Sequence, residues 1–197
     1  MLRVVSLVTA ISLVVAAAAS AAGWPTHRSA AGGFTIAAPA SWVDFTKATP
    51  QALKVAEANP ALRPYLTLVR TQKLMKLLLV DSTSQTLRNR FATNLNVIQL
   101  PTPLALGDLR RLEVAQLERA HVLVGRVNAT YARLPAGQAL RLAYQARFGS
   151  TAPVVAITQF ILVRRGVESV ITYTTLPNAS AAYQSTFAAS AGTLRFG

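Results

Sequence analysis

The chain has 197 residues, which suits one globular domain with a short extension and leaves little room for a second domain. It contains no cysteine, which excludes disulfides, thiolate metal sites and cysteine nucleophiles. The 20 Lys and Arg against 7 Asp and Glu give a formal net charge of +13, and a field of this sign attracts polyanions or anionic surfaces. Nucleic acid is not an expected partner, because aromatic residues make up only 7% and offer few stacking platforms.

The first residues have the order of a secretory signal peptide: a positive charge at Arg3, an apolar core over Val4–Ala19, and small residues around Ala21. Cleavage at this point assigns residues 1–22 to the signal peptide. The mature chain then keeps 19 Lys and Arg against 7 Asp and Glu, a charge of +12. An uncleaved anchor helix is the alternative, since the apolar run is near the lower limit of roughly 17 residues for a membrane span. We expect a secreted or cell-envelope location, with no further span once the leader is removed.

Residues 23–32 are rich in Gly, Ala and Ser and predict a flexible segment before a single folded domain at residues 33–197. At the start of that domain, Phe34–Ile36 and Trp42–Phe45 lie on either side of a proline and predict a small hairpin. A helix is expected to begin at Pro50, where the missing N–H costs nothing. After this helix, an apolar run of strand length ends at Asp81.

The stretch FATNLNVIQL, residues 91–100, predicts a strand with Asn94 and Asn96 on the same face as Ile98. No neighbouring residue completes a catalytic site, so we interpret the two asparagines as structural side chains that bond to loop backbone or water. The next segment, residues 106–120, has the composition of a surface helix. Glu113 interrupts its apolar stripe, and we expect this residue at an exposed edge.

The last third predicts antiparallel strands and a closing helix. The stretch GQALRLAYQARF alternates, with Leu142 and Tyr144 opposite Arg141 and Gln145, which indicates a strand with one solvent-facing side. The stretch PVVAITQFILVRRGVESVITYTTLP predicts a long hairpin that turns at RRG and is apolar on both faces. Helical spacing of apolar residues in AAYQSTFAASAGTL predicts a helix that packs on the sheet.

The chain carries no recognisable catalytic, cofactor or metal motif. The two histidines, His27 and His121, have no partner at ligand spacing, so no metal site is expected. No G-x-S-x-G elbow and no glycine-rich phosphate loop occurs. The seven carboxylates form no pair that is local in sequence, although a pair assembled in space stays open. We therefore expect a non-enzymatic protein without a cofactor, with a hydrolase as the remote alternative.

The order of these elements resembles the PsbP-like domain, the fold shared by the extrinsic photosystem II subunit PsbP, a Ran-binding nuclear-transport factor and many exported bacterial proteins. The resemblance covers roughly residues 33–196 and rests on GFTIAAPASW, TNLNVIQL, LPAGQALRLAY, TQFILVRRGVESVITYTT and YQSTFAASAGTLRF. It implies an α+β fold, a mostly antiparallel central sheet flanked by helices in an α/β/α sandwich. It also implies action by binding rather than catalysis. The chain departs from the family in the helical sequence between residues 43 and 76, and no family contact with Ran or photosystem subunits can be carried over.

Two functional hypotheses follow. The first is an exported module that binds an unknown protein partner or an acidic envelope component through its basic surface, and its oligomeric state is open. Four arginines in predicted loops are the candidate contacts for an anion or a partner: Arg88, Arg90, Arg164 and Arg165. The alternative is a carrier of a small ligand or lipid, which would need the closing helix to stand off the sheet.

Overall fold

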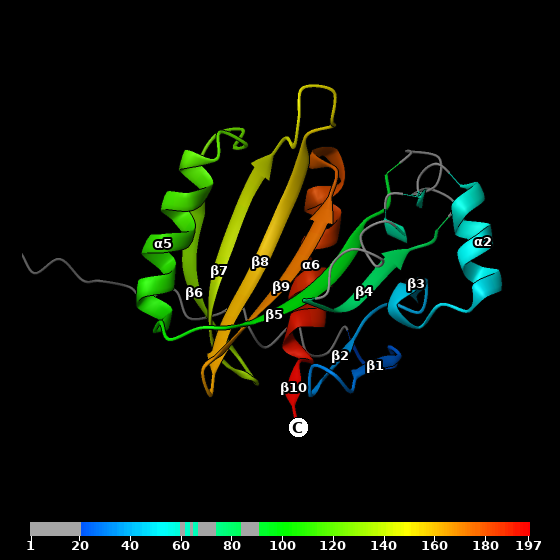
Figure 1. Cartoon of the computed structure of the whole chain (residues 1–197), viewed down its shortest axis with the longest axis horizontal. Coiled ribbons are helices and arrows are strands. Elements are labelled where there is room, and N and C mark those ends of the chain that lie inside the picture. The colour runs from blue at the N-terminus through cyan, green and yellow to red at the C-terminus, as the bar shows by residue number, and fades with distance from the viewer. Residues whose placement is uncertain (1–20, 60–61, 64, 67–73, 84–90) are drawn as a thin grey trace, which may run out of the picture.

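The computed structural model describes residues 21–59, 62–63, 65–66, 74–83 and 91–197. Within them the chain forms a seven-stranded antiparallel sheet, a three-stranded sheet and helices that pack on both faces of the large sheet (Figure 1). This is the α+β, helix-flanked arrangement that the sequence predicts. Among these residues, no helix combines the length and hydrophobicity needed to cross a lipid bilayer.

The large sheet has the strand order β3-β4-β5-β9-β8-β7-β6. Its four-strand run from β6 to β9 confirms the antiparallel strands predicted for the last third. Strand β4 pairs antiparallel with β5. The β8–β9 turn places Arg165 at φ 51° and Gly166 at φ 74°, the backbone of a two-residue hairpin loop. The strands are β3 (Trp42–Asp44), β4 (Met75–Asp81), β5 (Asn94–Pro101), β6 (Asn128–Leu134), β7 (Gly137–Ala146), β8 (Val155–Arg164) and β9 (Val167–Thr175).

The small sheet corrects two expectations from the sequence. Its strands are β1 (Thr26–Ser29), β2 (Phe34–Ala37) and β10 (Arg195–Phe196), and β2 pairs with both of the others. The predicted hairpin between Phe34–Ile36 and Trp42–Phe45 is therefore wrong, because β3 pairs with β4 in the large sheet instead. Part of the segment predicted to be flexible forms β1, whose hydrogen bonds to β2 and buried Ser29 give it order.

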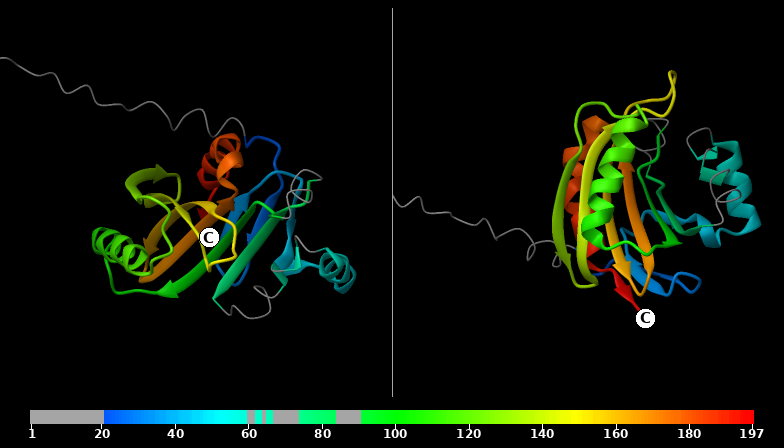
Figure 2. Two further views of the ribbon diagram at one scale, coloured as in Figure 1. Left: turned by 90° about the horizontal axis from the view of Figure 1, so that it is seen from above. Right: turned by 60° about the vertical axis from the view of Figure 1, so that its left-hand side comes forward.

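The helices cover opposite faces of the large sheet, as Figure 2 shows from two further directions. Helix α6 (Ser180–Gly192), preceded by the 3-10 turn η2 (Pro177–Ala179), lies on one face together with the small sheet. On the other face, α5 (Leu106–Arg119) covers the β6–β8 end and α2 (Pro50–Ala58) the β4 end. The 3-10 turn η1 (Phe45–Lys47) links β3 to the segment before α2. We call the two sides the α6 face and the α5 face.

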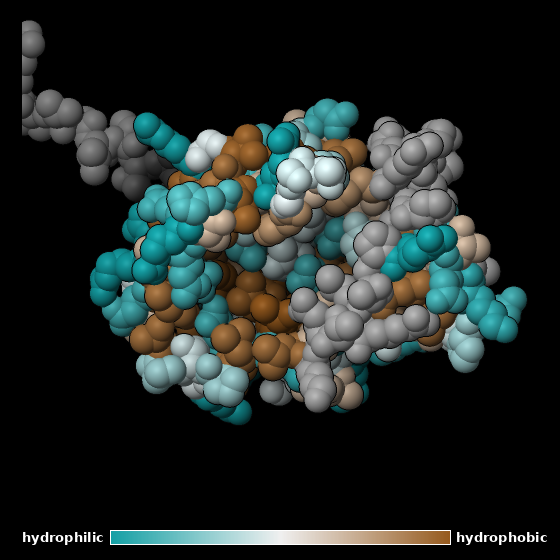
Figure 3. All heavy atoms as spheres, turned by 45° about the horizontal axis from the view of Figure 1, so that its top comes forward, coloured by the Kyte–Doolittle hydropathy of each residue, from teal (hydrophilic) through white to brown (hydrophobic). Residues whose placement is uncertain are grey.

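Among the described residues, the α5 face has two apolar clusters instead of one continuous core. One joins α5 to β7 and β8 around Leu109, Leu140 and Ile161, and the other joins α2 to β4 around Ala56 and Leu78. Figure 3, seen with the top of the molecule turned forward, shows a hollow with hydrophobic residues on its floor. Within the part of the chain that the structure describes, the centre of this face is therefore less completely filled than the clusters at its two ends.

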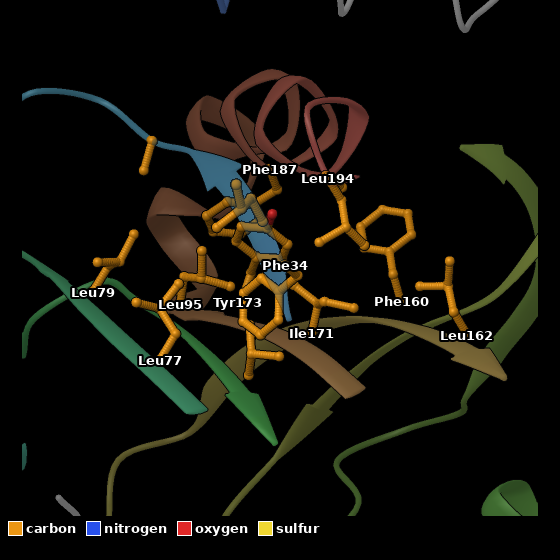
Figure 4. Packing of buried hydrophobic residues seen from close by; sticks show 14 of the residues in the cluster. Phe34, Leu77, Leu79, Leu95, Phe160, Leu162, Ile171, Tyr173, Phe187 and Leu194 are labelled. Atoms are coloured by element: carbon orange, nitrogen blue, oxygen red, sulfur yellow. The ribbon is translucent and has the colours of Figure 1, made fainter. Parts of the chain in front are cut away.

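The α6 face holds the main core. Tyr173 of β9 is stacked on Phe187 of α6 with ring centroids 4.7 Å apart, and Phe160 meets Tyr173 edge-on at 6.2 Å. Figure 4 shows Phe187 and Leu194 on one side of this core and the strand residues on the other. Offset and edge-on ring pairs add to the stabilisation that burial provides. Helix α6 therefore lies directly on the sheet and leaves no space for a ligand between Phe187 and the strands beneath it.

Candidate functional site

The structure describes two of the four arginines predicted as contacts. Arg88 and Arg90 lie outside the described residues. Arg164 and Arg165 lie exposed at the β8–β9 hairpin end, as the sequence predicts. The Arg164 guanidinium stands 5.4 Å from the centroid of the Phe196 ring, a cation–π distance that attaches this side chain to β10. Arg164 thus has a structural contact within the fold. The backbone conformation of Arg165 is that of the hairpin turn.

A polar pocket of about 320 Å³ lies at the other end of β8, on the α6 face. Strands β7 and β8 form its floor, the N-terminal part of α6 one wall, and the loop before β6 contributes Arg126. Arg141 and Gln145 belong to the side of β7 for which alternation predicts solvent exposure, and both line the pocket. Six polar side chains line it in all: Arg126, Arg141, Gln145, Thr158, Ser180 and Gln184.

The two pocket arginines have no protein counter-charge. No carboxylate of the described residues forms an ion pair with either, and all seven Asp and Glu of the chain lie in that part. Arg126 is exposed and Arg141 is partly buried. An arginine that stays charged under all ordinary conditions and has no partner in the fold is available to an external anion.

A sequence signal for this pocket existed in the distribution of charge. Between Glu118 and Glu168 the chain contains no acidic residue but seven arginines: Arg119, Arg126, Arg133, Arg141, Arg147, Arg164 and Arg165. This block builds β6, β7 and β8, which are adjacent at one end of the large sheet. Basic residues without acidic residues near them in sequence are therefore concentrated in the part of the chain that forms β6, β7 and β8. The contact with α6 could not be read from sequence, because it depends on how the last helix crosses the strands.

The α5 face carries a second polar feature, a row of side chains across the central strands. Tyr144 Oη donates to Gln159 Oε1 at 3.2 Å, and Gln159 Nε2 donates to Thr172 Oγ1 at 3.2 Å. Asn96 is paired with Thr172 on the next strand and extends the row. Gln159, Thr172 and Asn96 are partly exposed. The row therefore leaves polar groups accessible between the two apolar clusters of this face.

Two carboxylates lie near this row. Glu113, expected at an exposed edge of its helix, is instead partly buried, and this burial raises its pKa. Glu168 is only 4% exposed, and its pKa is raised by burial and then by the negative charge of Glu113. Burial, with a smaller contribution from Glu113, also raises the pKa of Tyr144 to about 12. The same burial and the negative charge of Glu113 make the region unfavourable for a further anionic group.

The asparagines of β5 differ in their surroundings. Asn94 is 5% exposed, and its Nδ2 donates to the Ala92 carbonyl at 3.1 Å and to Tyr65 Oη at 3.2 Å. Tyr65 Oη in turn donates to the same carbonyl at 2.6 Å. The prediction that Asn94 is a structural residue bonded to loop backbone is confirmed. Its side chain is buried and does not face solvent. Asn96 is partly exposed.

The histidines and carboxylates do not assemble a metal site in the part of the chain that the structure describes, where no group of three or more potential ligands occurs. His27 lies 3.9 Å from Asp44, a contact between the small and the large sheet. Burial lowers the pKa of His27, against the opposing effect of the Asp44 charge. His121 is exposed after α5 with φ 52°.

Known proteins resemble this chain in structure rather than in sequence. No family model and no curated protein matches the sequence. The solution structure of cyanobacterial PsbP (CyanoP) from Synechocystis sp. PCC 6803 gives a TM-score of 0.57 at 11% identity and covers 98% of both chains. LpqN, described as involved in cell envelope biogenesis of Mycobacterium tuberculosis, gives 0.50 at 8% identity and covers 87% of this chain and 84% of its own.

A further structure, from Bacteroides thetaiotaomicron VPI-5482, gives a TM-score of 0.51 at 11% identity and covers 87% of this chain but 48% of that one. Identities this low relate the folds alone. The match to CyanoP along nearly the whole length agrees with the strand order and helix placement described above. The chain therefore has the PsbP-like fold.

Proposed function

We propose that this chain is a non-enzymatic, extracytoplasmic binding module that recognises an acidic partner, either a protein or a component of the cell envelope. The predicted signal peptide of residues 1–22 supports the location. An envelope role is known for one protein of this fold, LpqN, which makes such a role compatible with the architecture. The binding surface that we assign is the basic end of the large sheet, formed by β6, β7 and β8.

The observation that carries the proposal is the segregation of charge in the acid-free block between Glu118 and Glu168. Residues 119–167 contribute seven arginines and no carboxylate, and four of these arginines have no ion pair in the described structure: Arg126, Arg133, Arg141 and Arg147. Exposed charges of one sign raise the local concentration of oppositely charged molecules and steer their approach. Because no carboxylate of the described residues pairs with these arginines, their positive electrostatic field can attract an acidic partner.

The experiment measures association of the chain with polyglutamate and with anionic envelope extracts at low and high salt. Two double variants lose the same amount of charge. Arg133→Gln with Arg147→Gln alters the basic end, and Arg28→Gln with Lys54→Gln alters exposed residues on β1 and α2. We expect binding at low salt that weakens as salt rises, with a larger loss for the first variant than for the second.

If the unaltered chain bound neither polyglutamate nor the envelope extracts at low salt, the proposal of an acidic partner would be overturned. Equal losses in the two double variants would show that net charge alone governs binding, which would overturn the assignment to β6–β8. The two results are separate, because the first concerns the partner and the second the surface.

The α5 face supports a second candidate function, the binding of a small neutral ligand. The polar row of Tyr144, Gln159 and Thr172 crosses an otherwise apolar, hollowed face, which is the combination found in small-molecule sites. From the sequence, a carrier was expected to hold its ligand under the closing helix. In this candidate the ligand lies on the α5 face instead. Native mass spectrometry of the chain purified from its own host tests it, and the absence of any bound mass would count against it.

A further inference from the structure

We infer that the pocket between β7, β8 and α6 is a specific site for a small organic oxyanion: a phosphate or carboxylate group carried on a hydroxylated, sugar-like molecule. The inference rests on the proposed function, because it takes the basic end of the sheet as a binding surface. It goes further by assigning one pocket within that surface and the chemical class of its ligand.

The oxyanion part follows from the two arginines. Arg126 and Arg141 line the same pocket from different elements, a loop and a strand, and neither has a carboxylate partner in the described structure. A guanidinium presents planar, paired N–H donors that match the oxygens of phosphate and carboxylate. Two such groups in one pocket select an anion over a neutral molecule.

The hydroxylated part follows from the other polar side chains. Gln145, Thr158, Ser180 and Gln184 line the pocket, and none of these side chains makes a hydrogen bond to the described residues. Amides and hydroxyls both donate and accept, which suits the hydroxyl groups of a sugar better than an aliphatic chain. The volume of about 320 Å³ is at the small end of the range for ligand pockets, roughly 300–1,000 Å³, so one sugar-sized unit fits better than a long acyl chain.

The helix beside the pocket favours the same sign of charge. Ser180 opens α6, and the residue before it makes no side-chain cap bond. The N-terminal end of a helix carries partial positive charge, which attracts an anion within about one turn. This contribution adds to the two arginines and does not replace them.

The experiment measures binding of four probes to the full chain by titration calorimetry at low salt: glucose 6-phosphate, glucuronate, inorganic phosphate and glucose. The test variant is Arg126→Gln with Arg141→Gln. Its control is Arg133→Gln with Arg147→Gln, which removes equal charge from the same basic end at residues that do not line the pocket. We expect glucose 6-phosphate or glucuronate to bind more tightly than phosphate or glucose. We also expect a loss of about tenfold or more in the test variant and a loss several times smaller in the control, whose arginines act only through the field of the basic end.

Other outcomes distinguish this inference from the proposed function. If polyglutamate binds while none of the small probes does, the pocket assignment is overturned and the proposed function stands. Equal losses in the two variants would likewise overturn the pocket, because the field of the surface would then explain the binding. If inorganic phosphate binds as tightly as glucose 6-phosphate, the hydroxylated part of the assignment is wrong. Failure of both polyglutamate and the small probes would overturn both.

A milder variant guards against a folding defect. Arg141→Lys keeps the charge on β7 but loses the paired donors, so we expect weaker binding of the oxyanion with an unchanged melting temperature. Full affinity in this variant would overturn the role of the guanidinium.

Discussion

The two faces of the central strands differ although they are built from alternate residues of the same segments. On β9, Ile171 and Tyr173 enter the core of the α6 face, whereas Thr172 and Thr174 are partly exposed on the α5 face. One face holds stacked aromatic rings, and the other holds a chain of hydrogen bonds from Tyr144 to Thr172. The difference indicates that stability is concentrated on one face and that the other can carry polar groups without a full apolar cover.

The largest test of this difference is Phe187→Ala on the α6 face. Phe187 is buried against Tyr173, Trp42 and Tyr183, so its removal leaves a cavity at the centre of the core. We expect a loss of about 3–5 kcal/mol in the free energy of unfolding, measured by denaturant titration. Thr172→Ala on the opposite face is the comparison and should cost less than about 1 kcal/mol. Similar costs for the two variants would remove the distinction between the faces.

The asparagines of β5 provide a test within the α5 face. We expect Asn94→Ala to lower the free energy of unfolding by about 1–3 kcal/mol, because it leaves a buried carbonyl and Tyr65 Oη with fewer partners. Asn96→Ala, at a partly exposed position two residues on, should change it by less than about 0.5 kcal/mol. Chemical denaturation of both variants checks the pair. An effect of Asn96→Ala as large as that of Asn94→Ala would contradict the structural interpretation.

The buried carboxylate of Glu168 gives a smaller, pH-dependent effect. Burial raises the pKa of Glu168 above its ordinary value of 4.5, so the folded state binds its proton more tightly than the unfolded state does. Its contribution to stability is therefore fully present below about pH 4.5 and is lost as pH rises through the raised pKa. We expect Glu168→Gln to raise the melting temperature at pH 7 and to change it little at pH 4.

Thermal unfolding of Glu168→Gln at both pH values checks this sign, with Glu118→Gln on the exposed side of α5 as the control. A lower melting temperature of Glu168→Gln at pH 7 would show that the carboxylate has a stabilising contact in solution.

The smallest expected effect belongs to the polar row itself. Gln159→Leu removes the link between Tyr144 and Thr172, but the site is partly exposed and water can satisfy both hydroxyls. We expect the free energy of unfolding to change by less than about 0.5 kcal/mol. A loss above about 2 kcal/mol would mean that the row stabilises the α5 face, which would weaken its case as a ligand site.

Much of the fold could be predicted because its signals are local. The β8–β9 hairpin follows from two apolar runs and the RRG turn, and α5 is observed within one residue of its predicted C-terminal end. The pairing of β2 could not be predicted, because Phe34–Ala37 pairs with strands on both sides and one of them, β10, lies at the far end of the sequence. A proline between two short runs is also compatible with a hairpin, and only the tertiary structure decides against it.

The candidate sites were less accessible from the sequence than the strands. Alternation places Arg141 and Gln145 on one side of β7, but it does not say that the N-terminal part of α6 lies beside them. Loop position favours Arg164 and Arg165 as contacts, yet the structure places them at the opposite end of β8 from the pocket, about 20 Å away along the strand. Proximity of this kind arises from packing, which composition and spacing do not encode for single residues.

The pairing of β2 with the end of the chain has a consequence for the order of folding. The Ala37 N–H donates to Thr193 Oγ1, and the Ala37 carbonyl accepts from Ser190 Oγ, across separations of 156 and 153 residues. These partners do not exist until at least 153 further residues have been synthesised. Contacts between residues so distant in sequence also slow folding. Strand β2 can therefore pair with β1 early, but it lacks β10 and the bonds to Ser190 and Thr193 until then, so this corner is among the last parts of the domain to close.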